Sequence, residues 1–193
     1  NAVNDAPVSG GLTVSVSEDS SVAGTLGASD AEGDSLGFAL ASGAANGTAV
    51  VNANGSYSYT PNANYAGADS FTYTVSDGNG GVTTATVSVT VNGINDAPTT
   101  SSVNRLVDED ETATGTLTAA DVDGDSLTFA LASGPSNGTA SVNANGSYSY
   151  TPNAGYNGPD SFTYTVSDGN GGSATATVSL TITDANDAPE TPG

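Results

Sequence analysis

Large apolar residues alternate with small or hydroxyl-bearing residues along most of this chain. Residues 71–76 read Phe-Thr-Tyr-Thr-Val-Ser, and residues 13–17, 36–40 and 86–91 alternate in the same way. A period of two places one set of side chains in a core and the other in water, as in a half-buried β-strand. No segment keeps the period of an α-helix. The pattern therefore predicts an all-β protein.

Turn residues separate these stretches. Asn54-Gly55 lies between the apolar stretches at 50–51 and 57–59, and both turn residues tolerate the positive φ of a tight hairpin. Residues 77–81, Asp-Gly-Asn-Gly-Gly, join the strand at 71–76 to the strand at 86–91. About seven short strands separated by such turns are typical of an immunoglobulin-like sandwich.

The chain is an internal repeat. Asn-Asp-Ala-Pro begins at residues 4, 95 and 186, a spacing of 91, and residues 69–81 are identical to residues 160–172. A copy of this size can bury its own core. The proline of the motif ends strand pairing and favours an extended link. We therefore predict two domains, residues 1–95 and 96–193.

The charge of the chain excludes several functions. There are 21 acidic residues against one basic residue, Arg105, and there is no Cys or His. Disulfides, thiolate metal sites, histidine-based catalysis and lysine chemistry are therefore excluded. Phosphates would repel a chain of charge −20, and no apolar run could span a membrane, so neither nucleic acid binding nor membrane insertion is expected.

Disorder and catalysis are the alternatives that the acidity leaves open. An acidic chain can be disordered, but the alternating aromatic and β-branched residues favour a folded β-protein. Catalysis would have to rest on carboxylate pairs, as in glycoside hydrolysis. Because the acids occur twice, at equivalent places in a small sandwich with no evident cleft, we predict that the protein is not an enzyme.

The acids gather in short clusters at turns and strand ends. Alternate turns share one end of a sandwich, so we expect Glu18, Asp69 and Asp96 to meet where the first copy finishes, and Asp121, Asp123 and Asp168 to meet where the second begins. Converging carboxylates without a cation repel one another. Ca²⁺ accepts about six to eight oxygen ligands in loose geometry, whereas Mg²⁺ demands a tight octahedron. The clusters therefore predict calcium.

A simpler interpretation is that Asp, Asn and Gly occupy these loops because they form turns. It accounts less well for Glu18 and Glu109, since Glu is not a turn former. The predicted ligands are Asp5, Glu18, Asp30, Glu32, Asp34, Asp69, Asp77, Asn95, Asp96, Glu109, Asp121, Asp123, Asp125, Asp160, Asp168, Asp184, Asn186 and Asp187.

Residues 184–189, Asp-Ala-Asn-Asp-Ala-Pro, resemble the D-x-N-D-x-x-P linker of cadherin repeats, and they follow a Val-Ser-Leu-Thr-Ile-Thr strand. The order of the acids also fits: a Glu near the first strand, a D-x-D after the second and an Asp closing the sixth. The chain is most similar to the cadherin-like, VCBS-type repeats of large bacterial surface adhesins. The resemblance implies tandem Greek-key β-sandwiches of the immunoglobulin and cadherin type, joined end to end, with Ca²⁺ at each linker.

Carried over by position, the resemblance divides the ligands into sets. At the central junction, Glu18, Asp69, Asn95 and Asp96 resemble ligands of the upper domain, and Asp121, Asp123 and Asp168 those of the lower domain. Glu109, Asp160, Asp184, Asn186 and Asp187 would await a third repeat, and Asp34 and Asp125 would complete sites within a domain. Gly93 stands where Asp184 stands in the second copy, so we expect only one or two ions at the central junction.

The function implied is mechanical. We expect calcium-rigidified extender repeats of a secreted or cell-surface bacterial adhesin that supports adhesion or biofilm formation. Their partners would be neighbouring repeats of the same polypeptide, and the isolated fragment would be monomeric. The alternative is a recognition module that binds carbohydrate or a like domain in calcium-dependent adhesion.

Overall fold

The computed structural model describes residues 3–185, and all of these lie in strands, turns or irregular segments, with no helix. The all-β prediction is confirmed. The chain forms two compact units, Asn1–Ile94 and Asn95–Gly193. Since the described residues contain no helix, they contain none that is long and apolar enough to cross a membrane.

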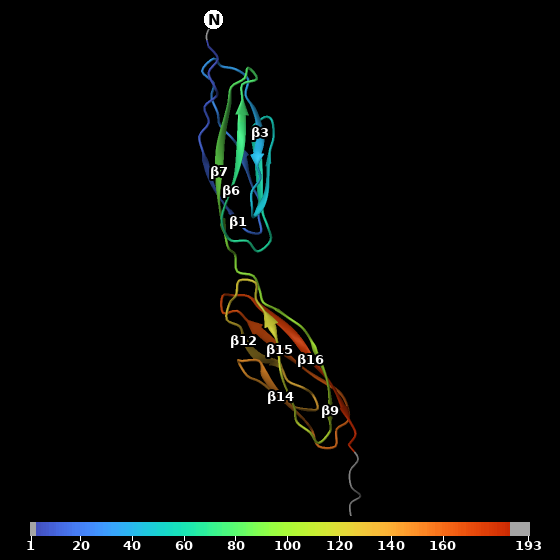
Figure 1. Ribbon diagram of the computed structural model, residues 1–193. Helices are drawn as coiled ribbons and strands as arrows, with labels where there is room; N and C mark the ends of the chain where they lie inside the picture. The colour runs from blue at the N-terminus through green and yellow to red at the C-terminus, as the bar shows by residue number, and fades with distance from the viewer. Residues whose placement is uncertain (1–2, 186–193) are drawn as a thin grey trace, which may run out of the picture. The chain divides into compact units, whose positions relative to one another are not determined.

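Unit 1 contains the seven strands that the turn pattern predicts. They are β1 (Leu12–Ser17), β2 (Val22–Thr25), β3 (Gly37–Ser42), β4 (Gly47–Val51), β5 (Ser56–Pro61), β6 (Gly67–Ser76) and β7 (Val82–Asn92). One sheet has the order β1-β7-β6-β3, and the other has the order β2-β5-β4. The two sheets form the layers of a sandwich (Figure 1).

Pairing between the strands of unit 1 is antiparallel except at one edge. The long strands β6 and β7 pair from Gly67↔Val91 to Ser76↔Val82. At the edge of the same sheet, β1 pairs with β7 in parallel over six residues. The first strand of the unit therefore lies beside its last.

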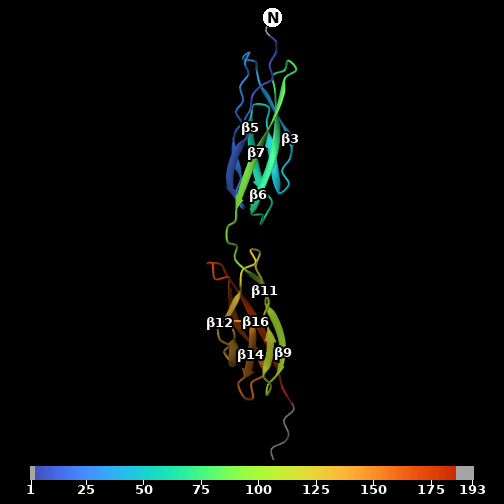
Figure 2. The ribbon, with the colours of Figure 1, turned by 60° about the vertical axis from the view of Figure 1, so that its left-hand side comes forward.

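Unit 2 repeats this arrangement with two additional short strands. Its strands are β8 (Thr99–Thr100), β9 (Val103–Asp108), β10 (Ala113–Thr116), β11 (Ala119–Ala120), β12 (Thr128–Ser133), β13 (Gly138–Val142), β14 (Ser147–Pro152), β15 (Gly158–Ser167) and β16 (Ser173–Thr183). The sheets have the orders β12-β15-β16-β9 and β10-β14-β13, while β8 pairs with β11. Figure 2 shows β9 and β16 in this unit.

Each unit has its own aromatic core between its sheets. In unit 1 the rings of Tyr59 and Phe71 stack at a centroid distance of 6.4 Å, and both side chains are almost fully buried. Tyr150 and Phe162 repeat the pair in unit 2 at 6.5 Å. The period of two holds along β6 and β7. It fails at Leu40, which is 39% exposed, because β3 is an edge strand whose register shifts between Leu40 and Ser42.

Candidate metal centre

The acidic end of unit 2 brings three carboxylates into one group. Asp121 and Asp125 lie in the turn that follows β11, and Asp168 follows β15. One oxygen of each carboxylate lies within 4.8 Å of the others, a separation that a single cation can bridge. Asp168 is only 4% exposed. The structure therefore places three of the predicted ligands together within one unit.

The turn that carries Asp121 organises itself around this side chain. Asp121 Oδ1 accepts hydrogen bonds from the backbone N–H of Asp123 at 3.0 Å and of Asp125 at 3.2 Å. Gly124 has φ +79°, a conformation that favours glycine. Asp121 Oδ2 is buried and has no hydrogen-bond partner. A buried carboxylate oxygen without a donor is unfavourable unless a cation or water satisfies it.

Neutral amides donate to the other carboxylates. Asn95 Nδ2 donates to Asp168 Oδ2 at 2.8 Å, and Asn170 Nδ2 donates to Asp125 Oδ2 at 2.7 Å. The hydrogen bond from Asn95, together with bonds from backbone amides, holds the pKa of Asp168 below its usual value. The backbone N–H of Asp96 donates to Asp123 Oδ2 at 2.7 Å. These amide donors stabilise negative charge, but none of them carries a positive charge.

Unit 1 has the same network at its equivalent end. Asp77 accepts from Asn4 at 2.9 Å, and Asp34 accepts from Asn79 at 2.8 Å. The side-chain hydrogen bond from Asn4 is the main cause of a lowered pKa at Asp77. Asp30 Oδ2, like Asp121 Oδ2, is buried without a hydrogen-bond partner. The hydrogen-bond network and the unpartnered oxygen thus repeat with the sequence, while the close group of three carboxylates is found in unit 2.

Two further predicted ligands take part only at the rim of this network. The backbone N–H of Asp5 donates to Glu32 Oε2 at 3.1 Å, as that of Asp96 does to Asp123 in unit 2. Both Asp5 and Glu32 are exposed. They contribute negative charge beside the buried acids.

Each unit also buries one glutamate directly after its first long strand, Glu18 after β1 and Glu109 after β9. Glu18 is 4% exposed and accepts from the backbone N–H of Ile94 at 2.6 Å. Glu109 is 6% exposed and accepts from Ala185 N–H at 3.1 Å. That amide favours the ionised form, but burial and the carboxyl of Asp184 together raise the pKa of Glu109. Asn186 and Asp187, predicted to join Glu109, lie outside the described residues.

Asp69 and Asp160 serve a purpose that the sequence did not indicate. Asp69 is the third residue of β6, so the expectation that all the acids avoid the strands is wrong at this position. Its carboxylate accepts from Ala45 N–H (3.1 Å), Asn46 N–H (2.9 Å), Ser70 N–H (2.8 Å) and the hydroxyl of Tyr59 (2.9 Å). The bonds from Ala45, Asn46 and Tyr59 tie the loop between β3 and β4 to the core.

Asp160 makes the same contacts in unit 2, where it accepts from Ser136 and Asn137 N–H and from the hydroxyl of Tyr150. Burial alone would raise the pKa of Asp69 and Asp160, but their hydrogen bonds together lower it. Both carboxylates already have donors on each oxygen. Their geometry fits a structural anchor.

Sequence reasoning did not identify Asn79 and Asn170 as amide donors to the acids. Both lie in Asp-Gly-Asn-Gly-Gly turns, which the sequence repeats without change. A turn motif explains their presence through backbone conformation alone. Only the fold brings them to acids 45 residues away in the chain.

The sequence pattern of a bacterial Ig domain matches residues 4–90 and again residues 95–181. The chain belongs to the bacterial Ig domain family. The two matches coincide with the two compact units and confirm an immunoglobulin-like repeat. No curated protein sequence matches this bacterial Ig chain.

Solved structures show the same fold. A mouse cadherin-23 fragment, EC22-24, is 20% identical with a TM-score of 0.58, and the match covers 94% of this chain and 65% of that one. A human CDH23 fragment, EC21-23, is 21% identical with a TM-score of 0.58 and covers 94% and 70%. The endo-fucoidan hydrolase MfFcnA4 is 25% identical with a TM-score of only 0.41, and the bacterial Ig chain spans 29% of its length.

Proposed function

We propose that these bacterial Ig units are calcium-binding extender repeats of a secreted or cell-surface adhesin, of the cadherin-like, VCBS type. The chain would work outside the cell as a non-catalytic spacer. Its partners would be further repeats of the same polypeptide. Bound cations would stiffen the ends of each repeat. A surface protein whose repeats hold a binding region away from the cell would support adhesion or biofilm formation.

One observation carries the calcium assignment. In each unit an aspartate, Asp30 or Asp121, has a buried oxygen with no donor, inside a turn crowded with further carboxylates. Hydrogen bonds from neutral amides satisfy the surrounding acids, but they do not neutralise charge. Ca²⁺ is bound by carboxylate and carbonyl oxygens in flexible geometry. Asp121, Asp125 and Asp168 would hold the ion in unit 2, and the ion would supply the positive charge that these residues lack.

A thermal melt in Ca²⁺ against EDTA tests this assignment. Extracellular calcium modules bind with dissociation constants of about 10⁻⁴–10⁻³ M. Ca²⁺ at several millimolar would then add about 1–2 kcal/mol to a folded unit. For a domain of this size the midpoint should rise by roughly 5–10 °C. Mg²⁺ at the same concentration should shift the midpoint much less.

A matched pair of variants separates site binding from general screening of charge. Asp30→Asn/Asp121→Asn removes two charges at the buried oxygens. Asp110→Asn/Glu111→Gln removes two charges at exposed positions outside the predicted ligands. The first variant should lose most of the calcium shift, and the second should keep it. An unchanged midpoint in the parent chain, or an equal loss in both variants, contradicts the proposal.

A further inference from the structure

The first and last long strands of each unit lie side by side and run in the same direction. In unit 1, β1 and β7 pair in parallel from Leu12↔Val87 to Ser17↔Asn92, with no shift of register. In unit 2, β9 and β16 pair in parallel in the same register, 91 residues on. We propose that these two parallel pairs are shear clamps that carry tension along the chain. The inference rests on the proposed extender function only for the source of the tension.

The direction of the strands decides how a pull is borne. The chain enters β1 at Leu12 and leaves β7 at Asn92, and in a parallel pair these two residues lie at opposite ends. Tension applied at those ends slides the strands past each other along their axes. Parallel hydrogen bonds are evenly spaced along a pair, so the six residue pairs share the load. A pair loaded at one end would instead open one bond at a time.

A buried glutamate extends each clamp to the point where the chain leaves the unit. Glu18 follows β1, donates its backbone N–H to Asn92 O at 3.0 Å and accepts from Ile94 N–H at 2.6 Å. In unit 2, Glu109 N–H donates to Thr183 O at 3.1 Å, and Ala185 N–H donates to Glu109 Oε1 at 3.1 Å. Hydrogen bonds to an ionised acceptor are stronger than neutral ones. Each glutamate thus has a role that requires no cation.

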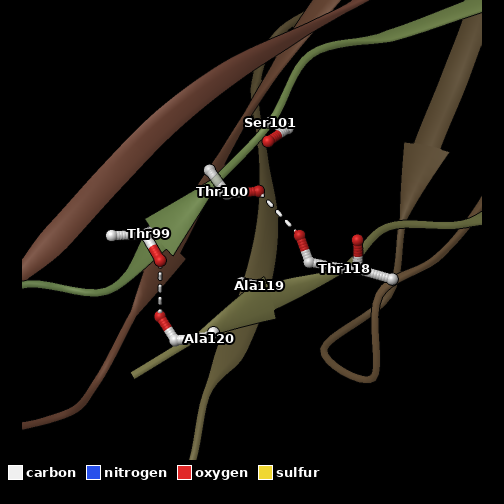
Figure 3. Close-up of a pocket in the computed structure, with 6 residues that line it drawn as sticks. All are labelled: Thr99, Thr100, Ser101, Thr118, Ala119 and Ala120. Atoms are coloured by element: carbon white, nitrogen blue, oxygen red, sulfur yellow. Dashed lines mark hydrogen bonds between the residues drawn. The ribbon is translucent and has the colours of Figure 1, made fainter. Parts of the chain in front are cut away.

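The segment that precedes the clamp has little backbone pairing and is held mainly by single side-chain hydrogen bonds. In unit 1 its one backbone bridge has bonds between Val8 and Ser29 of 2.7 and 2.9 Å, and Asn4 and Ser9 add side-chain bonds to Asp77 and Gly27 O. In unit 2 the corresponding contact is the short antiparallel pair of β8 and β11. There the hydroxyls of Thr99 and Thr100 also bond to Ala120 O and Thr118 O, and these residues line a hollow of about 310 Å³ (Figure 3). These short contacts should yield first and leave the parallel pair as the main barrier.

Single-molecule pulling on the full chain in two geometries tests the clamp. The chain has no native cysteine, so handles can be attached at chosen sites. Val3→Cys/Asn92→Cys loads β1 and β7 in shear, because Val3 lies ahead of β1 in the chain. Val3 is 83% exposed, so a handle can reach it. Ser20→Cys/Asn92→Cys loads the same pair from one end. The two variants share a handle, so they probe the same unit in two directions.

The expected result in EDTA is an unfolding force at least twofold higher in the shear geometry, since forced unfolding reports the barrier along the pulled coordinate. Unfolded chain lengths between the handles of about 300 Å and 240 Å, at roughly 3.3–3.6 Å per residue, identify unit 1 in the two variants. Equal forces in the two geometries would overturn the proposal.

Glu18 variants test the contribution of the glutamate. Glu18→Ala should lower the shear force, whereas Glu18→Gln keeps an acceptor for Ile94 N–H and should retain most of the shear force in EDTA. An undiminished shear force in Glu18→Ala would overturn the assigned role of Glu18. The two proposals can fail separately. A twofold geometric ratio in EDTA supports the clamp whether or not Ca²⁺ raises the melting midpoint, and an unchanged midpoint contradicts only the calcium assignment.

Discussion

Replacing Asp69 with asparagine tests whether this residue anchors a loop or binds a metal. The side chain receives four hydrogen bonds, two from the loop amides of Ala45 and Asn46, one from Ser70 N–H and one from Tyr59. Asn offers one acceptor oxygen and one NH₂ group in place of two acceptor oxygens. With the NH₂ group toward Ala45 and Ser70, two backbone donors face a donor. With the NH₂ group toward Asn46 and Tyr59, only the backbone donor of Asn46 does, because the tyrosine hydroxyl can accept instead.

The expected cost follows from the loss of charge on the acceptor and from the backbone donor left unsatisfied. A hydrogen bond to a charged group contributes about 1.5–3 kcal/mol, and an unsatisfied buried donor costs about 1–3 kcal/mol. Asp69 is half-buried, so water can satisfy part of the loop, and we expect about 3 kcal/mol of destabilisation in unit 1. Urea unfolding should show a midpoint lower by about 1.5–2 M. The decrease should be the same in Ca²⁺ and in EDTA.

Amide exchange read by mass spectrometry locates the effect. The loop of residues 43–46 should exchange faster in Asp69→Asn, while the equivalent loop of unit 2 serves as an internal control. Asp160→Asn should reverse the pattern. A Tyr59→Phe partner completes a double-mutant cycle with a positive coupling energy. A loss below about 0.5 kcal/mol, the range of ordinary surface changes, or a loss seen only with calcium, would refute the anchor.

Three further outcomes are expected. Gly47→Ala places a Cβ about 2.6 Å from the buried ring of Tyr59 and should destabilise unit 1 by roughly 1–3 kcal/mol in urea unfolding, whereas Gly27→Ala has open space and should be near neutral. Because the pKa values of Asp69 and Asp160 are lowered in the folded state, the stability that they add is present above about pH 4 and is lost as the pH falls through the folded pKa. The urea midpoint should therefore decrease from about pH 5 to pH 2, and a flat profile would contradict this. Trypsin has one target bond, after Arg105 in β9. Fragments 1–105 and 106–193 should appear on gels only as urea frees β9 from β16, and rapid cleavage of the native chain would show that the pairing is weak.

Much of the fold could be predicted from local pattern. Alternation along 71–76 and 86–91 specifies which face of β6 and β7 is buried, because a slip of one residue would turn every apolar side chain outward. The Asn54-Gly55 turn specifies a hairpin, and Gly55 adopts φ +85° there. The exposure of Leu40 was not predictable in this way because it depends on a bulge at a sheet edge.

The residue types of the candidate site were predictable, but the hydrogen-bond partners of each residue were not. The Asp-x-Asp-Gly-Asp run implies a turn that gathers carboxylates, and the structure contains that turn around Asp121. The same reasoning assigned Asp69 to a metal because it treated every repeated acid alike. Asp69 accepts hydrogen bonds from Asn46 and Tyr59, which come from other strands and loops. No spacing in the sequence reveals these partners.

The sequence by itself determined the repeat, the strand period and the excess of 21 acidic residues over a single basic one. The tertiary structure alone decided which acids are anchored by amides, which are left with an unsatisfied oxygen, and that the first and last strands of each unit run in parallel. The physical reason is the distance along the chain between the residues that interact. Burial and turn conformation are local properties of a few neighbouring residues, whereas hydrogen bonds such as Ile94 N–H to Glu18 join positions 76 residues apart and form only when the sandwich closes.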